Sequence, residues 1–394
     1  MGNFVPFLLV LFVIAALLRV DFFFTIVYLF FAVYLLSRLW FRRTEERLSV
    51  RRHFVGRAFF GDQVPVDVLV HNTGWLPIPW LEVNESLPVQ LTSPPFYRRV
   101  VSLGIHERRR FQYVLNCRQR GYYSIGPLTL ESGDLLGFVS RSMAQASADH
   151  LIVYPRVVPL HKLGLPTHSP LVALPTRSPL FEDPARVMGV RDYQRGDSPR
   201  RIHWTATASA GHLLVKQYQP AIARETLICL DMDQADYEQG HRHAAVEMAI
   251  VAAASIANHI SVKEHLPVGL TTEGQDPLLG RQVCFYLPPR SERAHLMNVL
   301  EVLARVQTAS EAPFADLLRR QSVNLAWGAT LSVITGRESD ALLDTLVYLK
   351  RTGFAVALIL IQPGRPRADL HARASLLGVP IHRVWHDRDL EAWE

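Results

Sequence analysis

The residues best suited to chemistry gather in one run of the sequence, residues 191–218, which reads RDYQRGDSPRRIHWTATASAGHLLVKQY. The run combines arginines, aspartates, a tryptophan and a lysine, the residue types of ion-pair networks and of protein or nucleic-acid interfaces. Because the interleaved aspartates leave no net basic stripe, we expect no nucleic-acid binding. The Arg-Gly-Asp triplet at residues 195–197 is interpreted as a turn held by ion pairs rather than as an adhesion motif.

The second half of this run is predicted to form a helix followed by a strand. Asp197 or Ser198 would cap the helix, Pro199 would take its first position and Gly211 would end it. The letters HLLVKQY that follow have the composition of a strand. The charged residues ahead of the helix would then tie the loop and the helix to that strand.

Trp204 lies on this predicted helix and allows two interpretations. In the first, it is buried in the joint between a β-rich domain and an α/β domain, with Arg201 and Asp197 holding the turn that positions it. In the second, it is the exposed centre of a partner-binding patch, as interface tryptophans often are. We expect the first, because dense acid–base pairing with glycine and proline punctuation usually fixes a fold.

After residue 221 the sequence alternates apolar strand patterns with helix patterns, which is typical of a mostly parallel sheet covered by helices. Ligand sites in such sheets lie beyond the carboxyl ends of the strands. We therefore expect one edge of the sheet to collect polar side chains from several strands. They are Asp231, Asp233, Thr271, Thr272 and Thr335.

One interpretation of this edge is enzymatic. A strand ending in Asp-x-Asp resembles a haloacid-dehalogenase-like, Mg-dependent phosphatase, in which Asp231 would be the nucleophile and Asp233 the acid/base. The other candidates for that site are Thr335, Lys350, Asp387 and Asp389. Because Asp-x-Asp is a short motif and Ala235 interrupts its usual continuation, we expect no enzyme and keep the phosphatase as the alternative.

Residues 48–155 show the period-two alternation of strands, clearest in VPVDVLVHN at residues 64–72. Short strands separated by glycine, proline and asparagine predict an antiparallel, β-sandwich-like domain. Its scattered histidines lack the spacing of metal ligands. We expect this domain to be a spacer or a docking face.

Two apolar runs, residues 4–18 and 22–36, flank a charged Arg-Val-Asp. Residues 1–47 are therefore predicted to form a transmembrane hairpin with a basic flank, because one helix would be too long and would carry two charges at its centre. Six arginines follow the second run, between residues 38 and 52. The positive-inside rule then places the later domains in the cytoplasm and the flank against membrane lipid.

The chain is thus predicted to be multidomain, with a linker and signature region at residues 156–220 and the α/β domain at residues 221–394. Its formal net charge of +6 is modest for 394 residues. The three cysteines are far apart and contain no CxxC pair, so neither disulfides nor a zinc knuckle is expected.

Residues 188–219 also resemble the signature of the bacterial "domain of unknown function 58" family, which runs Arg-x-Tyr-x-x-Gly-Asp, then Arg-x-Ile-x-Trp, then Leu-x-Val-Lys or Arg. The matching residues are Arg191, Tyr193, Gly196, Asp197, Arg200 or Arg201, Ile202, Trp204, Leu213, Val215 and Lys216. Residues 120–139 and the LIVYPR segment at 151–156 resemble further parts of the family pattern. His203 and Thr205 depart from it, since the family usually has charged residues beside the tryptophan.

The resemblance implies a C-terminal domain like the von Willebrand factor A fold, in a protein of the bacterial inner membrane. It implies partnership with a MoxR-type AAA+ ATPase, often alongside a transglutaminase-like membrane protein, and it brings no established enzymatic activity. The signature or interaction residues would be Arg191, Tyr193, Gly196, Asp197, Arg201, Trp204 and Lys216.

The same resemblance raises the question of a magnesium ion. Von Willebrand A domains often hold Mg²⁺ through Asp-x-Ser-x-Ser and a later Thr and Asp, the oxygen ligands that this ion requires. Here Asp231 is retained, Asp233 and Ala235 replace the serines, and Gly336 stands at the later Asp position. We expect no cofactor, with Asp231 and Asp233 as a degenerate metal site.

Overall fold

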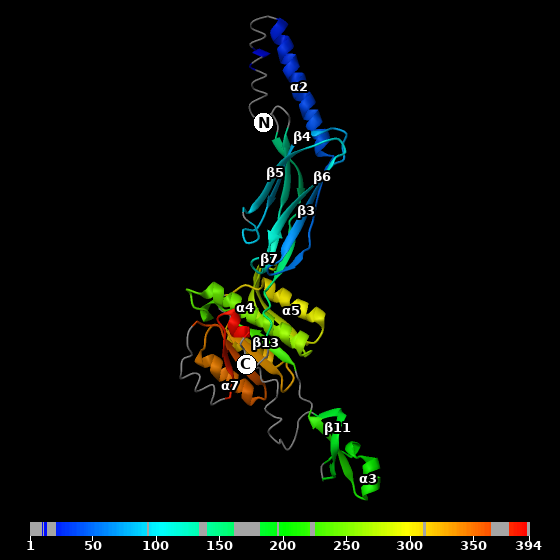
Figure 1. The fold of residues 1–394 in the computed structure, drawn as a ribbon, viewed down its shortest axis with the longest axis vertical. Coiled ribbons are helices and arrows are strands. Elements are labelled where there is room, and N and C mark those ends of the chain that lie inside the picture. The colour runs from blue at the N-terminus through cyan, green and yellow to red at the C-terminus, as the bar shows by residue number, and fades with distance from the viewer. Residues whose placement is uncertain are drawn as a thin grey trace. The chain divides into compact units, whose positions relative to one another are not determined.

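The structure is a computed structural model of the chain, which forms two compact units, Met1–Arg156 and Val157–Glu394 (Figure 1). The described residues are 10, 12–13, 21–92, 94–133, 140–160, 182–194, 197–220, 225–309, 313–363 and 378–391. The division of the chain into four parts with the predicted boundaries stays a prediction.

The first unit begins with a long apolar helix, α2 (Asp21–Glu45), drawn in blue in Figure 1. Its Phe24–Glu45 stretch is long and apolar enough to cross a membrane. A second stretch, Arg242–Lys263, passes the same test but is 78% buried inside the protein, so it is a core helix. The first arm of the predicted hairpin lies almost wholly outside the described residues. The ring of Phe12, which is described, meets the ring of Phe24 edge-on.

The last turns of α2 pack into the β-rich part of the first unit. Phe41 is only 6% exposed and belongs to the same hydrophobic core as the strands. The indole nitrogen of Trp40 donates a hydrogen bond to the carbonyl of Pro77 at 3.2 Å. Thr44, which is also buried, donates to the Trp40 carbonyl. The helix therefore ends as part of the β-rich core rather than as a free linker.

Ten strands form the rest of this unit, which we call the β-rich unit. They are β1 (Leu48–His53), β2 (Arg57–Phe59), β3 (Gln63–Asn72), β4 (Ile78–Ser86), β5 (Phe96–Leu103), β6 (Arg108–Asn116), β7 (Gly121–Ile125), β8 (Leu128–Gly133), β9 (Ser140–Ala146) and β10 (Asp149–Tyr154). They form three sheets, β1-β3-β6, β2-β10-β7 and β5-β4-β8-β9, around one hydrophobic core. The predicted β-rich middle is confirmed, although β2 and β10 pair in parallel, so the unit is not wholly antiparallel.

The alternation that predicted β3 is also its burial pattern. Val64, Val66, Val68 and Val70 are at most 4% exposed, and the residues between them point the other way. Side chains of a strand alternate between its two faces, so one face of β3 lines the core.

A buried ion network crosses the core of the β-rich unit. The Arg52 side chain on β1 and the Glu85 side chain on β4 are 1% and 0% exposed and form an ion pair. Arg52 also donates to Asp149 at 2.8 Å and to the Ser147 carbonyl at 2.7 Å. The Tyr113 hydroxyl donates to the second oxygen of Glu85 at 2.6 Å. The network therefore links side chains from four strands, β1, β4, β6 and β10.

The second unit, which we call the α/β unit, is built on a six-stranded sheet in the order β15-β14-β13-β16-β17-β18. Its strands are β13 (Thr226–Leu230), β14 (Val268–Asp276), β15 (Arg281–Arg290), β16 (Thr330–Thr335), β17 (Ala355–Leu360) and β18 (Ile381–Arg383). All neighbours pair in parallel except β14 and β15. The predicted mostly parallel α/β sheet is confirmed.

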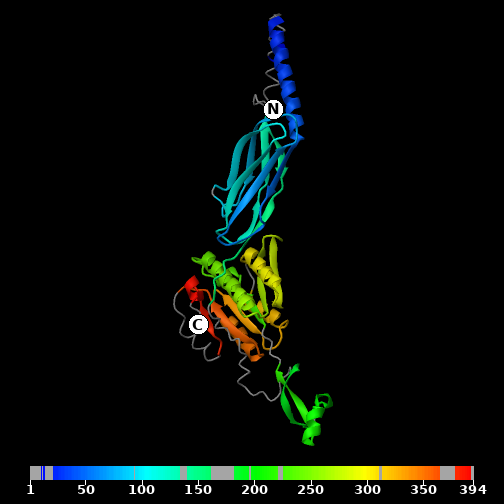
Figure 2. The same ribbon diagram turned by 45° about the vertical axis from the view of Figure 1, so that its right-hand side comes forward.

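Helices cover both faces of this sheet, as Figures 1 and 2 show. They are α4 (Arg242–Asn258), α5 (Arg293–Arg305), α6 (Phe314–Ser322), α7 (Asp340–Arg351) and the short α9 (Asp387–Glu391). The α6–α7 pair shares a core with β13, β16 and β17, while α4 packs beside α5 and against β13 and β16. The predicted helix at residues 367–378 lies outside the described residues, apart from Gly378.

A separate piece of the second unit carries the signature. Strands β11 (Glu182–Asp192) and β12 (Leu214–Pro220) pair antiparallel, and a 3₁₀ turn (Pro199–Arg201) and helix α3 (Trp204–Ala210) lie between them. We call these residues the signature hairpin.

The single predicted helix from Ser198 is wrong. Ile202 is extended and bridges to Val215, which breaks the helix after the 3₁₀ turn. His203 then caps α3 by accepting a hydrogen bond from the Ala206 amide at its Nδ1. Gly211, in the left-handed conformation with φ 74°, ends the helix as predicted.

Candidate functional site

The carboxyl ends of β13 and β16 bring the predicted polar residues together. Asp231, at the end of β13, is 1% exposed. One of its carboxyl oxygens accepts the Asp233 amide at 2.9 Å, and the other accepts the Thr335 hydroxyl at 2.6 Å. The expected convergence is confirmed for these three residues.

Thr271 and Thr272 contribute less to this edge than expected. Both are fully buried beside the end of β13, in register with Cys229 and Leu230. Strand β14 continues past them to Asp276, so they lie within the sheet rather than in a loop beyond it. The sequence pattern suggested a strand that ended at Thr272 because the polar residues after it resemble a turn.

Asp231 shares its buried position with a second carboxyl group, that of Asp236. The two side chains lie close enough for each to affect the pKa of the other. Burial raises the pKa of Asp231 well above its usual range, the Thr335 hydroxyl opposes that rise, and the Asp236 charge adds to it. Burial also raises the pKa of Asp236. One proton between two carboxyl groups is the expected state, because like charges this close disfavour double ionisation.

These residues do not fit a magnesium site of the von Willebrand A type. Both oxygens of Asp231 already have partners, and Ala235 and Gly336 offer no side-chain oxygen. A Cβ on Gly336 would lie 2.4 Å from the Tyr237 ring, which occupies the space that an aspartate there would need. Tyr237 is itself fixed, because its hydroxyl donates to the Asp231 carbonyl at 2.7 Å.

No group of three or more His, Cys, Asp or Glu side chains among the described residues is arranged to hold a metal ion. Asp233 accepts the Ala235 amide and caps a short 3₁₀ turn, so its carboxylate is used locally.

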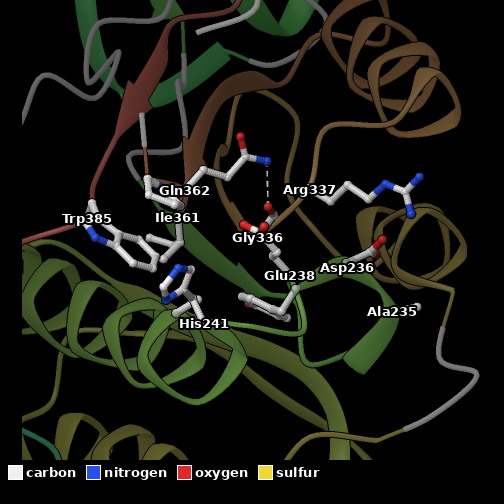
Figure 3. Close-up of a pocket in the computed structure, with 12 residues that line it drawn as sticks. Ala235, Asp236, Glu238, His241, Gly336, Arg337, Ile361, Gln362 and Trp385 are labelled. Atoms are coloured by element: carbon white, nitrogen blue, oxygen red, sulfur yellow. Dashed lines mark hydrogen bonds between the residues drawn. The ribbon is translucent and has the colours of Figure 1, made fainter. Parts of the chain in front are cut away.

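A hollow of about 320 Å³ opens at this edge of the sheet (Figure 3). Asp236 and Arg337 lie on one side of it, and Trp385 and His241 lie on the other with their rings edge-on. The Gln362 side chain donates to the Gly336 carbonyl at 2.7 Å between them. The hollow offers an aromatic wall, a guanidinium and carboxyl groups, a combination that can bind a polar segment.

The phosphatase candidates are not brought together. Lys350 lies in the last turn of α7, and its ammonium donates to the carbonyl of Gly378, which precedes β18. That end of α7 lies at the opposite edge of the parallel sheet from Asp231. Asp389 accepts the amides of Trp385 and His386 at 2.8 Å, which occupies one of its oxygens locally. Asp387 is the first residue of α9.

In the signature hairpin, Arg191 and Asp197 form a two-pronged ion pair with N–O distances of 2.6 and 2.7 Å. The Arg191 hydrogen bonds, followed by that from the Gln194 amide, lower the pKa of Asp197 to about 2. Arg191 is thus the arginine of this run that pairs with Asp197, and the charge of Arg201 lowers the same pKa further. The predicted ion-paired turn is confirmed.

The remaining signature residues are distributed along the hairpin. The Tyr193 amide donates to the Leu213 carbonyl at 3.0 Å, and Lys216 on β12 pairs with Val190 on β11. Gly196 lies outside the described residues. The Trp204 side chain is 67% exposed at the first position of α3. Trp204 is therefore not a core residue of this hairpin, and its place in the joint between the β-rich and α/β domains stays a prediction.

Several residues of the sheet edge were missed from the sequence. Asp236, Tyr237, Gln362 and Trp385 line the hollow or hold Asp231, yet none belongs to a recognisable motif. Asp236 carried a usable signal, because it follows Asp231 within the same short turn as Asp233. Trp385 and Gln362 lie on distant segments that only the folded sheet brings to this edge.

Comparison with known proteins points in the same direction as the signature. A family model described as "Protein of unknown function DUF58" matches residues 189–328. "Uncharacterized protein YeaD" of Bacillus subtilis (strain 168) is 21% identical over 273 residues, which are 66% of this chain and 63% of that protein. The chain thus spans less than two thirds of that relative's length.

Two solved structures resemble parts of the chain. The von Willebrand factor type A structure from Catenulispora acidiphila has a TM-score of 0.31 and 12% identity, covering 45% of this chain and 41% of its own. The CARDB domain of the PF1109 protein from Pyrococcus furiosus has a TM-score of 0.21 and 20% identity, covering 27% of this chain and 91% of its own. The family match through residues 189–328 confirms the resemblance of the signature to the DUF58 family.

Proposed function

We propose that the chain is a membrane-anchored interaction or scaffold protein whose α/β unit binds a partner and catalyses no reaction. The observation that carries this proposal is the state of Asp231, which is buried, fully hydrogen-bonded and paired with another carboxyl group. A nucleophile needs an exposed, ionised oxygen, and a metal ligand needs a free one. The hollow beside it remains available for binding.

The partner that the family resemblance favours is a MoxR-type AAA+ ATPase acting in the assembly or maturation of other proteins. A transglutaminase-like membrane protein is a further partner of this proposal. Both follow from the resemblance, and the exposed surface of the signature hairpin supplies a place for such a contact.

The signature hairpin has the properties of a docking element. Among the described residues its sheet has two strands, and such a sheet gains stability when another surface packs on it. Trp204 is exposed beside it, and a tryptophan is the residue type most often found at the energetic centre of an interface. The Arg191–Asp197 pair holds the turn ahead of that tryptophan.

The anchor of the proposal is α2 together with the apolar residues before it. The helix is exposed along most of its apolar length, as a helix facing lipid would be. Arg42 and Arg43 in its last turn favour a cytoplasmic position for the β-rich and α/β units, in the bacterial inner membrane.

Capture of a purified MoxR-type ATPase from the same organism tests the partner and the surface together. Trp204→Ala should abolish capture and leave the melting temperature unchanged, because the side chain is exposed. Tyr348→Ala on α7, which removes an aromatic of similar exposure (56%), is the matched control and should capture normally. Full capture by Trp204→Ala would rule out the hairpin as the contact, and a large loss of melting temperature would restore the structural interpretation.

Two further measurements address the anchor and the chemistry. Removal of residues 1–38 should release a soluble protein, whereas removal of 1–47 would also delete the buried Phe41 and Thr44. Protease added to intact spheroplasts should spare both units, and their digestion would reverse the orientation. Purified protein with Mg²⁺ should not hydrolyse a generic phosphate ester, and turnover that is lost in Asp231→Asn would establish the phosphatase instead.

A further inference from the structure

We propose that one end of the β-rich unit rests in the lipid headgroup layer, with Trp75 and Ile105 as its contacts. The surface consists of the β3–β4 loop, residues 73–77, and the β5–β6 turn, residues 104–107, and we call it the membrane-facing end. This inference rests on the proposed membrane anchor and goes beyond it, because it assigns a lipid-binding surface to a folded domain rather than to a helix.

The membrane-facing end is joined directly to α2. The Trp40 indole donates to the Pro77 carbonyl, so the β3–β4 loop lies at the level of Trp40. The Thr73 amide donates to the Arg47 carbonyl, and the His106 amide donates to the Gly74 carbonyl. These bonds lie within one compact unit, so both loops and the end of the helix form one surface.

The length of α2 sets the depth of this surface. From Phe22 to Leu39 the helix has 18 residues, which span about 27 Å at about 1.5 Å per residue. The hydrocarbon core of a bilayer is about 30 Å thick, and the headgroups extend it to about 40–45 Å. Trp40 therefore lies at the hydrocarbon boundary, and the loop bonded to it lies among the headgroups.

The side chains at this level have the chemistry of the interface. Trp75 is 67% exposed and Ile105 is 57% exposed, while Trp40 shows 36% of its surface. Tryptophan is enriched at headgroup level because its ring is apolar and its N–H can be hydrogen-bonded. Arg42 and Arg43 are exposed beside them and complement anionic headgroups.

Exposure alone does not single out this end, because the opposite end also shows apolar side chains. Strand β4 runs from Ile78 at the membrane-facing end to Ser86, and Val89 beyond it is 69% exposed. At about 3.3 Å per residue, β4 separates the two ends by about 30 Å. What distinguishes Trp75 is that its loop is bonded to the anchoring helix. The anchor keeps this loop close to the bilayer, so the effective concentration of lipid at Trp75 is higher than that of any soluble partner.

The test places one fluorophore at each of three depths in the full chain. In a Cys284→Ser background, Phe31→Cys in α2, Trp75→Cys in the loop and Val89→Cys at the opposite end are labelled with an NBD group. Native Cys117 and Cys229 are buried and should stay unlabelled. The Cys284→Ser protein without an added cysteine is the control for any labelling of these two residues. The protein is reconstituted in phosphatidylglycerol–phosphatidylethanolamine vesicles that contain two quenching lipids, one with a nitroxide near the headgroup, which reaches position 75, and one with a nitroxide in the middle of the acyl chain, which reaches position 31.

The expected result is quenching at positions 31 and 75, about twofold or more, with position 89 unaffected, because quenching decays within the thickness of the headgroup layer. Quenching at position 31 without quenching at position 75 or 89 would overturn the membrane-facing end and leave the anchor intact. Absence of quenching at all three positions would overturn the anchor itself. The two failures are therefore distinguishable in one set of samples.

Discussion

Glu85 in the β-rich unit and Asp231 in the α/β unit are both buried carboxyl groups, with 0% and 1% of the residue exposed, yet they are stabilised in opposite ways. Glu85 has a buried cation, Arg52, and a tyrosine hydroxyl from Tyr113. Asp231 has a hydroxyl and an amide as donors, and its charged neighbour is another carboxyl group, Asp236.

The difference shows the two ways in which a fold can bury an acid. A carboxylate taken out of water needs a paired cation, or it takes up a proton and becomes neutral. In the β-rich unit the chain supplies its own cation, and burial together with Glu85 raises the pKa of Tyr113 far above its usual range. In the α/β unit, burial beside Asp236 raises the pKa of Asp231, so that a proton takes the place of the cation.

Removing the cation from the first site should have the largest effect. Arg52→Met leaves Glu85 buried without a counter-charge and should cost about 3–5 kcal/mol of unfolding free energy. Urea unfolding of the detergent-solubilised chain, followed by tryptophan fluorescence, measures it. The double variant Arg52→Met with Glu85→Leu should recover most of the loss.

The matched control is Arg110→Met, which breaks the exposed pair with Asp67 on a neighbouring strand. Water solvates the carboxylate that remains, so the loss should be far smaller. Equal losses in Arg52→Met and Arg110→Met would mean that burial does not distinguish the two ion pairs.

A second change acts on the packing that holds the proton-sharing pair. Gly336→Ala adds a Cβ that would lie 2.4 Å from the Tyr237 ring and 2.6 Å from the Asp236 carbonyl. It should cost about 1–3 kcal/mol, as overpacking of a tight site does. Gly240→Ala, where a Cβ meets nothing within 4 Å, should be nearly neutral, and equal melting temperatures for the two variants would contradict the crowding.

The pH dependence of the α/β unit follows from the raised pKa of Asp231. The native state retains a proton that the unfolded chain, with an aspartate pKa of about 3.9, has released, so native stability falls as pH rises above that value. Asp231→Asn mimics the neutral acid and should flatten this fall. Its melting temperature should exceed that of the parent at pH 8, by about 2–4 °C for each kcal/mol of penalty removed, and should show no gain at pH 4.

Ala235→Ser is the control for that series, because it changes the same turn without adding a titrating group. It should keep the slope of the parent protein. A slope unchanged in Asp231→Asn would mean that Asp231 is ionised in the folded protein, and the comparison with Glu85 would fail.

The smallest effect is expected at the exposed pair of the signature hairpin, where water competes with the cation. Asp197 has a pKa of about 2 because of Arg191, so its contribution to stability is present above about pH 4 and is lost as pH falls toward 2. Arg191→Met should return this pKa toward about 3.9, measured by NMR titration of the carboxyl carbon. An unchanged titration would show that the pair does not persist in solution.

The periodicity of apolar residues, together with the glycine, proline and capping residues between them, was enough to predict the larger elements of the fold. The alternation in β3 and the apolar strand ending in Asp231 gave the β-rich and α/β parts, and Ser339 caps α7 by accepting the Leu342 amide. Ser291 has the residue type of a helix cap, but α5 begins after Glu292, because extended backbone continues one residue further. Local pattern fixes the type of an element better than its last residue.

The candidate site was predicted only where its residues are close in sequence. Asp231 and Asp233 were found because they end a strand, whereas Trp385 and Gln362 reach the same edge from later strands. The exposure of Trp204 could not be predicted from the residues around it. Charged residues that form ion pairs, together with glycine and proline, occur in the same pattern beside a buried core and on an exposed binding surface. The Tyr237 ring fills the space beside Gly336 where a metal ligand would lie. Such a contact depends on the folded structure and cannot be predicted from the spacing of residues in the sequence.

The burial of Phe41 in the β-rich core has a consequence for biogenesis. The last turns of a helix that would enter the bilayer during synthesis also complete the core of a domain that is translated after it. A chain whose helix is misplaced would present a β-rich unit with a gap in its core, exposed to cellular proteases. For the anchor proposed above, insertion of α2 and folding of the β-rich core would therefore be linked, because both use the last turns of the same helix.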